Sequence, residues 1–315
     1  CVRRWAADVL GGYRLSVDAI LGRMLAELVR LLSVGYDPAD RNGSVDRLTP
    51  HVAELVRAAR AEVYDEAVTL LQGLAADAGV DEPYIPSRGG YGDQSARSVL
   101  REELRGSPDE AAERVGRRLS QHAEDAGRQT MVRAVEDGRE PDDPADREHM
   151  SRDALPEVPP EKRESRRAKS WARVLTGAEN CAFCVVLASR GPVYSSAANA
   201  GRMTANEKFD ETGLRGYVNS YHDNCDCLVV PVYDFASWPG REDYLALERL
   251  YKQATSNPIW NGERVGEDVP RKDWPGSAKN DLLAAVDREL RYMQKQGIPL
   301  PVSDVRTGEP VKAAA

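Results

Sequence analysis

Aromatic side chains and long apolar runs are both scarce in this sequence. Aromatic residues make up 6% of the 315 residues, and only three of them are Phe. So few large apolar side chains argue against one large compact core and favour thin, mostly helical layers. No stretch approaches the roughly 20 apolar residues that a membrane-spanning helix needs. The sequence therefore predicts a mainly α-helical protein that has no membrane partner.

An excess of positive charge is also missing. The chain has 51 acidic residues against 43 Lys and Arg, which gives a formal net charge of −8. A protein that coats nucleic acid along its whole surface carries the opposite sign, so that class is excluded. A local basic patch stays compatible with this balance.

The N-terminus lacks the pattern of a secretion signal. Arg3 and Arg4 precede an apolar stretch, but Asp8 and Arg14 interrupt it. We therefore expect a chain that is made in a reducing cytoplasm. Because it begins with Cys1 and not with Met, we also expect a fragment or a processed product.

Motifs of common hydrolases are absent. The sequence contains neither the Gly-x-Ser-x-Gly motif of serine hydrolases nor the His-Glu-x-x-His motif of zinc proteases. His51, His122 and His149 are scattered among charged residues, so we expect them at the surface. The sequence thus predicts a protein that is not an enzyme.

Amphipathic helices dominate residues 1–135. Apolar residues recur at helical spacing over 5–32 and again over 52–71, with charged residues between them. Thr49 followed by Pro50 predicts the start of the second helix, since Thr caps helices and Pro suits the first helical position. The apolar faces are rich in Ala and thin. We therefore expect a helical region that docks on a partner.

A second helix start is encoded at Ser107, Pro108 and Glu110. Ser and Glu three residues apart can each bond the backbone N–H of the other, which makes a capping box around the proline. We therefore expect a helix to begin at Pro108.

Composition divides the rest of the chain. Residues 136–161 are rich in Asp, Glu and Pro, so we expect an acidic linker. Residues 162–236 carry the cysteines and predict a small α+β module. Residues 237–315 contain two helical stretches and are expected to form a helical extension that ends in a tail.

The small module opens with basic residues at helical spacing. These are Lys162, Arg166, Arg167, Lys169 and Arg173. On a helix, the spacing of four, three and four places most of them on one face, with Trp171 opposite. One interpretation is a solvated helix face that Trp171 anchors to the core. The other is a stripe that binds phosphate groups or an acidic partner.

Four of the five cysteines form two tight clusters that are typical of a metal site. The clustered residues are Cys181, Cys184, Cys225 and Cys227, and His222 stands three positions before the second pair. A Cys-x-x-Cys turn directs two sulfurs into one pocket, and strand residues two apart share a face. The pattern predicts structural Zn²⁺ held by four thiolates, or by three thiolates and His222; the sequence leaves both ligand sets open.

Two other interpretations of the cysteines compete with zinc. Two disulfides are disfavoured in a reducing compartment. A redox-active Cys181–Cys184 pair would need a surrounding βαβ pattern, which is missing here. A catalytic zinc is also disfavoured, because four protein ligands leave no open position for water.

The residues between the cysteine pairs predict the rest of the module. Residues 185–187 and 192–194 are expected to form the two arms of a hairpin that turns at Arg190 and Gly191. Residues 228–233 are expected to form an apolar strand. Together these pieces predict a small zinc knuckle.

The order of these motifs resembles a known family. It runs through Trp171, Cys181-x-x-Cys184, Leu187, Ser189-Arg190-Gly191, Val193-Tyr194, Tyr221-His222-Asp223-Asn224-Cys225-Asp226-Cys227 and Val230-Pro231-Val232-Tyr233. This pattern resembles the C-terminal domain of phage Mu F-like minor head proteins, especially those of phages that infect actinobacteria. It covers residues 162–233. Asp223 and Asp226 depart from the Pro and the basic residue that the family usually has there.

The resemblance implies a minor capsid protein of the virion that acts in phage head morphogenesis. Its expected partners are the portal protein and the major capsid protein, with packaged DNA as a further contact. The expected location is the capsid interior or the portal vertex, after synthesis in the host cytoplasm. The alternative is a zinc-dependent DNA-binding protein that uses the basic stretch 162–173.

Overall fold

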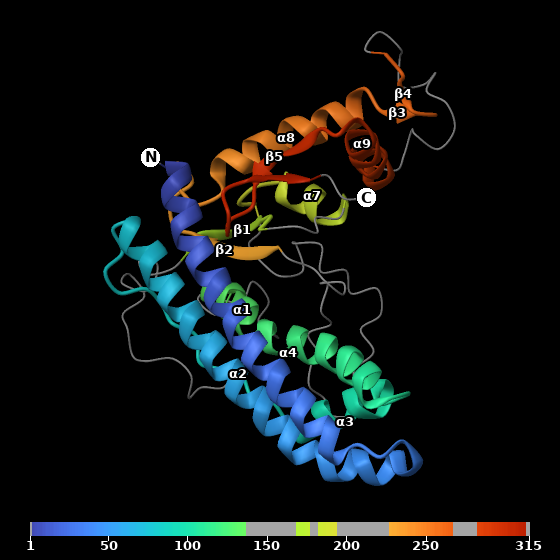
Figure 1. Ribbon diagram of the computed structural model, residues 1–315. Helices are drawn as coiled ribbons and strands as arrows, with labels where there is room; N and C mark the ends of the chain where they lie inside the picture. Colours follow the sequence, from blue (N-terminus) through green and yellow to red (C-terminus); the bar gives the residue numbers. More distant parts are fainter. Residues whose placement is uncertain (1, 137–167, 177–181, 194–226, 267–281, 313–315) are drawn as a thin grey trace, which may run out of the picture. The chain divides into compact units, whose positions relative to one another are not determined.

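The protein is mainly helical and carries small two-stranded sheets (Figure 1). The computed structural model describes residues 2–136, 168–176, 182–193, 227–266 and 282–312. None of the helices in these ranges is long and apolar enough to cross a membrane. The predicted acidic linker lies outside the described residues, apart from Glu136 at the end of a helix.

The chain divides into two compact units, which we describe separately. Residues 12–73 and 85–133 form what we call the helical unit. Residues 1–11, 74–84 and 134–315 form what we call the mixed unit.

The helical unit is built from the long helices that the apolar spacing predicted. Its elements are α1 (Val2–Gly35), the 3₁₀ turn Pro38–Asp40, α2 (Arg41–Asp77), α3 (Asp93–Glu103) and α4 (Pro108–Glu136). Apolar side chains from α1, α2 and α4 form its core; Leu28, Val52, Val63, Val115 and Leu119 are fully buried. The predictions of helices over 5–32 and 52–71 are confirmed.

The capping box at the start of α4 is confirmed. The backbone N–H of Ser107 donates to Glu110 Oε2 at 2.9 Å, and the N–H of Glu110 donates to Ser107 Oγ at 3.3 Å. This hydrogen bonding with Ser107 lowers the pKa of the Glu110 carboxyl. The two bonds satisfy backbone donors that the first turn of a helix leaves without partners.

The predicted helix start at Thr49 and Pro50 is wrong. Helix α2 begins at Arg41 and continues through Pro50, and the Thr49 hydroxyl donates to the Val45 carbonyl at 2.7 Å. Val45 and Leu48 are buried, so packing extends the helix upstream of the proline. Tertiary burial therefore outweighs the local stop signal of Pro50.

A buried ionic cluster joins α1 to α4 inside the helical unit. Glu124 accepts from Arg14 Nη2 at 3.1 Å through one oxygen and from Arg128 Nη2 at 2.6 Å through the other. Their side chains are 13%, 9% and 7% exposed, respectively. Burial raises the pKa of the Tyr13 phenol, which lies against Gly127 on α4. The cluster fixes the register of the two helices, because sliding one along the other would leave buried charges without a partner of opposite charge.

The surface prediction for the histidines holds only in part. His51 is exposed, as predicted, whereas His149 lies outside the described residues. His122 is half-buried, and its Nδ1 lies 3.1 Å from the Tyr91 hydroxyl. Burial lowers the pKa of His122, so the ring favours its neutral form. The prediction for His122 is wrong because it lies on an inward part of α4, where it contacts Tyr91.

In its described residues beyond 168, the mixed unit combines short strands with helices. Its elements are β1 (Ser170–Val174), α7 (Ala182–Ala188), β2 (Leu228–Val232), α8 (Arg241–Ser256), β3 (Ile259–Trp260), β4 (Glu263–Arg264), α9 (Leu282–Gln296), β5 (Pro299–Ser303) and β6 (Pro310–Lys312). Strands β1 and β2 pair antiparallel, and α7 packs against β1, α8 and α9 (Figure 1). The predicted strand over 228–233 is confirmed.

One apolar cluster holds the mixed unit together. It contains Leu175, Cys184, Val185, Cys227, Leu247, Val286, Leu290, Leu300, Val302 and Val311, among others. Residues of the predicted small module and of the predicted extension thus share a core. The predicted tail is wrong for 299–312, because β5 and β6 pair there and bury their apolar side chains.

The basic stretch does not continue as a helix to Arg173. Residues 170–174 form β1, and all five are buried. Arg173 is only 3% exposed and Lys169 is exposed, whereas Lys162, Arg166 and Arg167 lie outside the described residues. A strand that is buried on both faces shows no alternation of polar and apolar residues, so the spacing of charges misled the prediction.

The predicted hairpin arm at 185–187 is a helix instead. These residues belong to α7, and all three are buried. A short apolar run fits a buried strand and a buried helix equally well, so its pattern alone could not decide. The predicted hairpin turn at Arg190 and Gly191 is wrong as well: these residues follow the C-terminal end of α7, where Gly191 adopts φ 67°, a conformation that favours glycine.

Two neighbouring glycines of α1 are expected to respond oppositely to alanine. A methyl group at Gly11 would collide with the backbone carbonyl of Val305, whereas Gly12 has open space around it. We expect Gly11→Ala to cost about 1–3 kcal/mol through overpacking. Gly12→Ala should stabilise by up to about 1 kcal/mol through helix propensity.

Thermal melts of the two variants check this pair. A lower Tm for Gly11→Ala and an equal or higher Tm for Gly12→Ala are the expected results. Similar increases for both variants would contradict the close approach of α1 to Val305.

Candidate metal centre

Two buried cysteines meet in the core of the mixed unit. Cys184 lies on α7, and Cys227 directly precedes β2. Both side chains are 1% exposed, and their Sγ atoms lie 3.8 Å apart. The structure thus brings together one cysteine from each of the two sequence clusters.

The distance between the sulfurs has a chemical meaning. A disulfide holds its sulfurs roughly 2.05 Å apart, so these two residues are not bridged. Two thiolates that bind one tetrahedral zinc, each about 2.3 Å from it, lie about 3.8 Å from one another. The separation of Cys184 and Cys227 therefore fits a shared tetrahedral metal, and it also fits a hydrogen bond between two thiols.

The surrounding elements position the two sulfurs. Val174 pairs with Leu228, so Cys227 enters the core where the β1–β2 ladder ends. Helix α7 packs on β1 and on α8 and α9, which holds Cys184 in the same apolar cluster as Leu175 and Leu247. This apolar surrounding keeps water away from the sulfurs.

Arg173 is the charged neighbour of this pair. Its Nη1 donates to Cys227 Sγ at 3.3 Å. A cation beside a thiolate stabilises the anion, which is the form that binds metal. Sequence reasoning missed this role and placed Arg173 on a solvent-facing stripe. A signal was available, because Arg173 is the one charged residue in the stretch 170–176.

The remaining predicted ligands cannot be placed. Cys181, Cys225 and His222 lie outside the described residues. In the described part of the chain, no three His, Cys, Asp or Glu side chains gather in a way that could hold a metal ion. The structure therefore places two of the predicted donors together with one cation.

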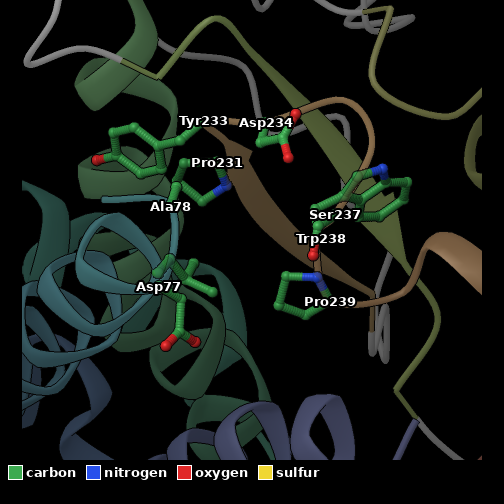
Figure 2. Close-up of a pocket in the computed structure, with 9 residues that line it drawn as sticks. Asp77, Ala78, Pro231, Tyr233, Asp234, Ser237, Trp238 and Pro239 are labelled. Carbon is green, nitrogen blue, oxygen red and sulfur yellow. The ribbon is translucent and has the colours of Figure 1, made fainter. Parts of the chain in front are cut away.

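A hollow of the mixed unit, separate from the cysteine pair, offers a different kind of surface (Figure 2). It is lined by Leu74, Asp77, Ala78, Pro231, Tyr233, Asp234, Ser237, Trp238 and Pro239. Burial raises the pKa of Tyr233, and Asp234 accepts a hydrogen bond from the Ala236 N–H at 3.0 Å. No histidine or lysine lines the hollow to activate the Ser237 hydroxyl, so these residues supply no nucleophile–base pair.

Comparison with known proteins gives a family match and two relatives. The model of the VG15 protein family matches residues 10–254. The gene 15 protein of Mycobacterium phage D29 is 42% identical over 86 residues, which cover 23% of this chain and 31% of that protein. The gene 15 protein of Mycobacterium phage L5 is 38% identical over 108 residues, which cover 28% of this chain and 37% of that protein.

The alignments span about a third of each curated relative. No solved structure matches the chain. Both relatives come from phages that infect actinobacteria, which confirms the coarser part of the predicted resemblance.

Proposed function

The chain belongs to the VG15 protein family, and on that premise we propose that it is a structural protein of a phage particle that acts in head assembly. The finer proposal is a Mu F-like minor head protein that docks on the portal or on the major capsid protein. Its location would be the capsid interior or the portal vertex, with packaged DNA as a further contact. The motif order over 162–233 supports this assignment.

The observation that carries the proposal is the buried pair of sulfurs. Cys184 and Cys227 lie 3.8 Å apart in an apolar core, beside the Arg173 guanidinium. This arrangement fits a structural Zn²⁺ whose other two ligands come from among Cys181, Cys225 and His222 in the sequence. When bound, zinc would tie α7 to the start of β2 and stabilise the mixed unit.

We further propose that the protein is not an enzyme. A zinc ion with four protein ligands has no open position for a reacting water. In the part of the chain that the structure describes, the hollow of Figure 2 also supplies no activated nucleophile. The proposed role of the metal is therefore to hold the fold.

One of the residues proposed to contact DNA in the alternative function is not available for that role. Arg173 is buried against Cys227, so it does not face a phosphate group in solvent. Lys169 is exposed but lies over the Phe235 ring at 5.8 Å. Residues 170–174 thus form a buried strand and not the end of a basic helix, which favours the structural role.

Purified phage particles test the proposed function. We expect quantitative mass spectrometry to find this protein in particles of the phage that encodes it, at a low ratio to the major capsid protein. Disrupted particles should release it together with the portal ring, and moderate salt should not separate the two. Its absence from both immature heads and finished particles would refute the assignment.

Binding assays with the purified chain distinguish the head-protein proposal from the DNA-binding alternative. Strong DNA binding that weakens steeply between low and high salt would favour the DNA-binding alternative, since released counterions give that dependence. Binding to the portal that is insensitive to salt would favour the head protein.

A further inference from the structure

We propose that Arg173 is a positioning residue of this metal site, which offsets the negative charge of the thiolates and holds the Cys227 sulfur in place. The inference rests on the proposed zinc site and extends it beyond the ligands. It assigns to Arg173 a role that neither the basic-stripe interpretation nor the cysteine spacing contains.

The first support is the cost of burying an arginine. All five residues of β1 are buried, and Arg173 is 3% exposed. A guanidinium keeps its charge inside a protein, so burial is tolerated when negative groups surround it. The Cys227 sulfur at 3.3 Å is one such group when it is a metal-bound thiolate.

The second support is the charge of the proposed site itself. Zinc carries two positive charges, and three or four thiolates outweigh them. The apolar cluster around Cys184 and Cys227 keeps water away from these two sulfurs. A buried guanidinium supplies the opposite charge where it is needed, whichever of the two ligand sets is present.

The third support is the strand register. Arg173 pairs with Val229, two residues beyond Cys227, and Val174 pairs with Leu228. The ladder therefore fixes the backbone of Arg173 relative to the cysteine that it contacts. Groups that bond metal ligands in this way orient them, and their loss typically weakens metal binding 10- to 100-fold.

Zinc affinity of the full-length chain tests the inference. The probe is Zn²⁺ alone, measured by competition with a chromogenic chelator. We expect Arg173→Met, which keeps much of the volume, to raise the zinc Kd about 10- to 100-fold while one zinc still binds per chain. Arg173→Lys keeps the charge but lacks the planar fork of donors, so we expect a smaller increase.

A matched arginine provides the control. Arg264 lies in the same unit and bonds both oxygens of the buried Glu289, at 3.0 and 2.6 Å. Arg264→Met should lower the Tm without changing the zinc Kd. If Arg173→Met likewise lowers the Tm and leaves the Kd unchanged, Arg173 has a packing role only and the inference is wrong.

The absorption spectrum of the Co²⁺-loaded chain gives a second readout, which a change in packing alone would leave unaltered. A hydrogen bond to a thiolate changes its donation to the metal. We therefore expect Arg173→Lys to shift the thiolate-to-cobalt absorption band of the Co²⁺-loaded chain, even if Arg173→Met does not fold. An unshifted band together with an unchanged Kd would overturn the role of Arg173. A wild-type chain that binds no zinc would overturn the metal site itself.

Discussion

Cys184→Ser and Cys227→Ser are each expected to abolish zinc retention and to destabilise the mixed unit by several kcal/mol. Structural zinc contributes its binding free energy to folding, about 10–16 kcal/mol in small zinc peptides. Serine replaces a soft sulfur donor with a hydroxyl that zinc binds poorly. Metal content per chain and thermal melts measure the two effects. Adding a strong chelator to the wild type should reproduce the loss of stability.

Cys1→Ser is the control for these variants. Cys1 is the fifth cysteine and lies far in sequence from both clusters. We expect Cys1→Ser to keep about one zinc per chain and the wild-type Tm. Zinc that persists in both Cys184→Ser and Cys227→Ser would show that the metal sits elsewhere. A wild-type chain that holds no zinc after purification without oxygen would exclude the site.

Glu124→Ala is expected to destabilise the helical unit by about 3 kcal/mol. It removes the carboxylate that bonds both Arg14 and Arg128, and breaking a buried ion pair from one side typically costs about 3–5 kcal/mol. We expect the lower end, because Arg14 keeps Asp18 at 2.9 Å and Arg128 keeps Asp125 at 3.7 Å. Chemical denaturation of the variant measures the change.

An exposed pair on the same helix provides the comparison. Glu113 pairs with Arg117 at 3.0 Å, but its side chain is 74% exposed. Glu113→Ala should change the stability by about 0.5 kcal/mol or less, as is usual for surface pairs. Equal losses for Glu113→Ala and Glu124→Ala would mean that burial of the cluster at Glu124 has no energetic effect.

The helices of the N-terminal half could be predicted because their signals are local. Apolar spacing marked α1 and α2, and the Ser107–Glu110 capping box marked the start of α4. Each of these patterns needs only neighbouring residues. Pro50 shows the limit, since Val45 and Leu48 are buried and α2 begins upstream of the proline at Arg41.

The apolar run of β2 could be predicted, whereas β1 could not, because its strand partner is distant in sequence. Strand β1 is buried on both faces, and its partner β2 lies more than fifty residues away. The residues of β5 and β6 were predicted to be a tail, and they include Pro299, Pro301 and Pro310. In a two-stranded sheet, one edge of each strand has no ladder to complete, so proline is tolerated there.

In the candidate site, too, local motifs could be predicted from the sequence, whereas contacts between distant residues could not. Cysteine spacing singled out Cys184 and Cys227, since ligand clusters are short motifs. Arg173 was assigned to the surface because the basic residues before it recur at helical spacing. Its partner Cys227 is 54 positions away, and only the pairing of β1 with β2 brings them together.

Because its residues are spread along the sequence, the core of the mixed unit can be completed only late in translation. Val311 packs in the same cluster as Leu175, Cys184 and Cys227. A ribosome releases the chain from its N-terminus, so the cysteines emerge long before the strand that covers their core. Until residue 311 leaves the exit tunnel, this apolar surface stays open to chaperones and to other nascent chains. Early zinc capture would protect the thiols during that interval.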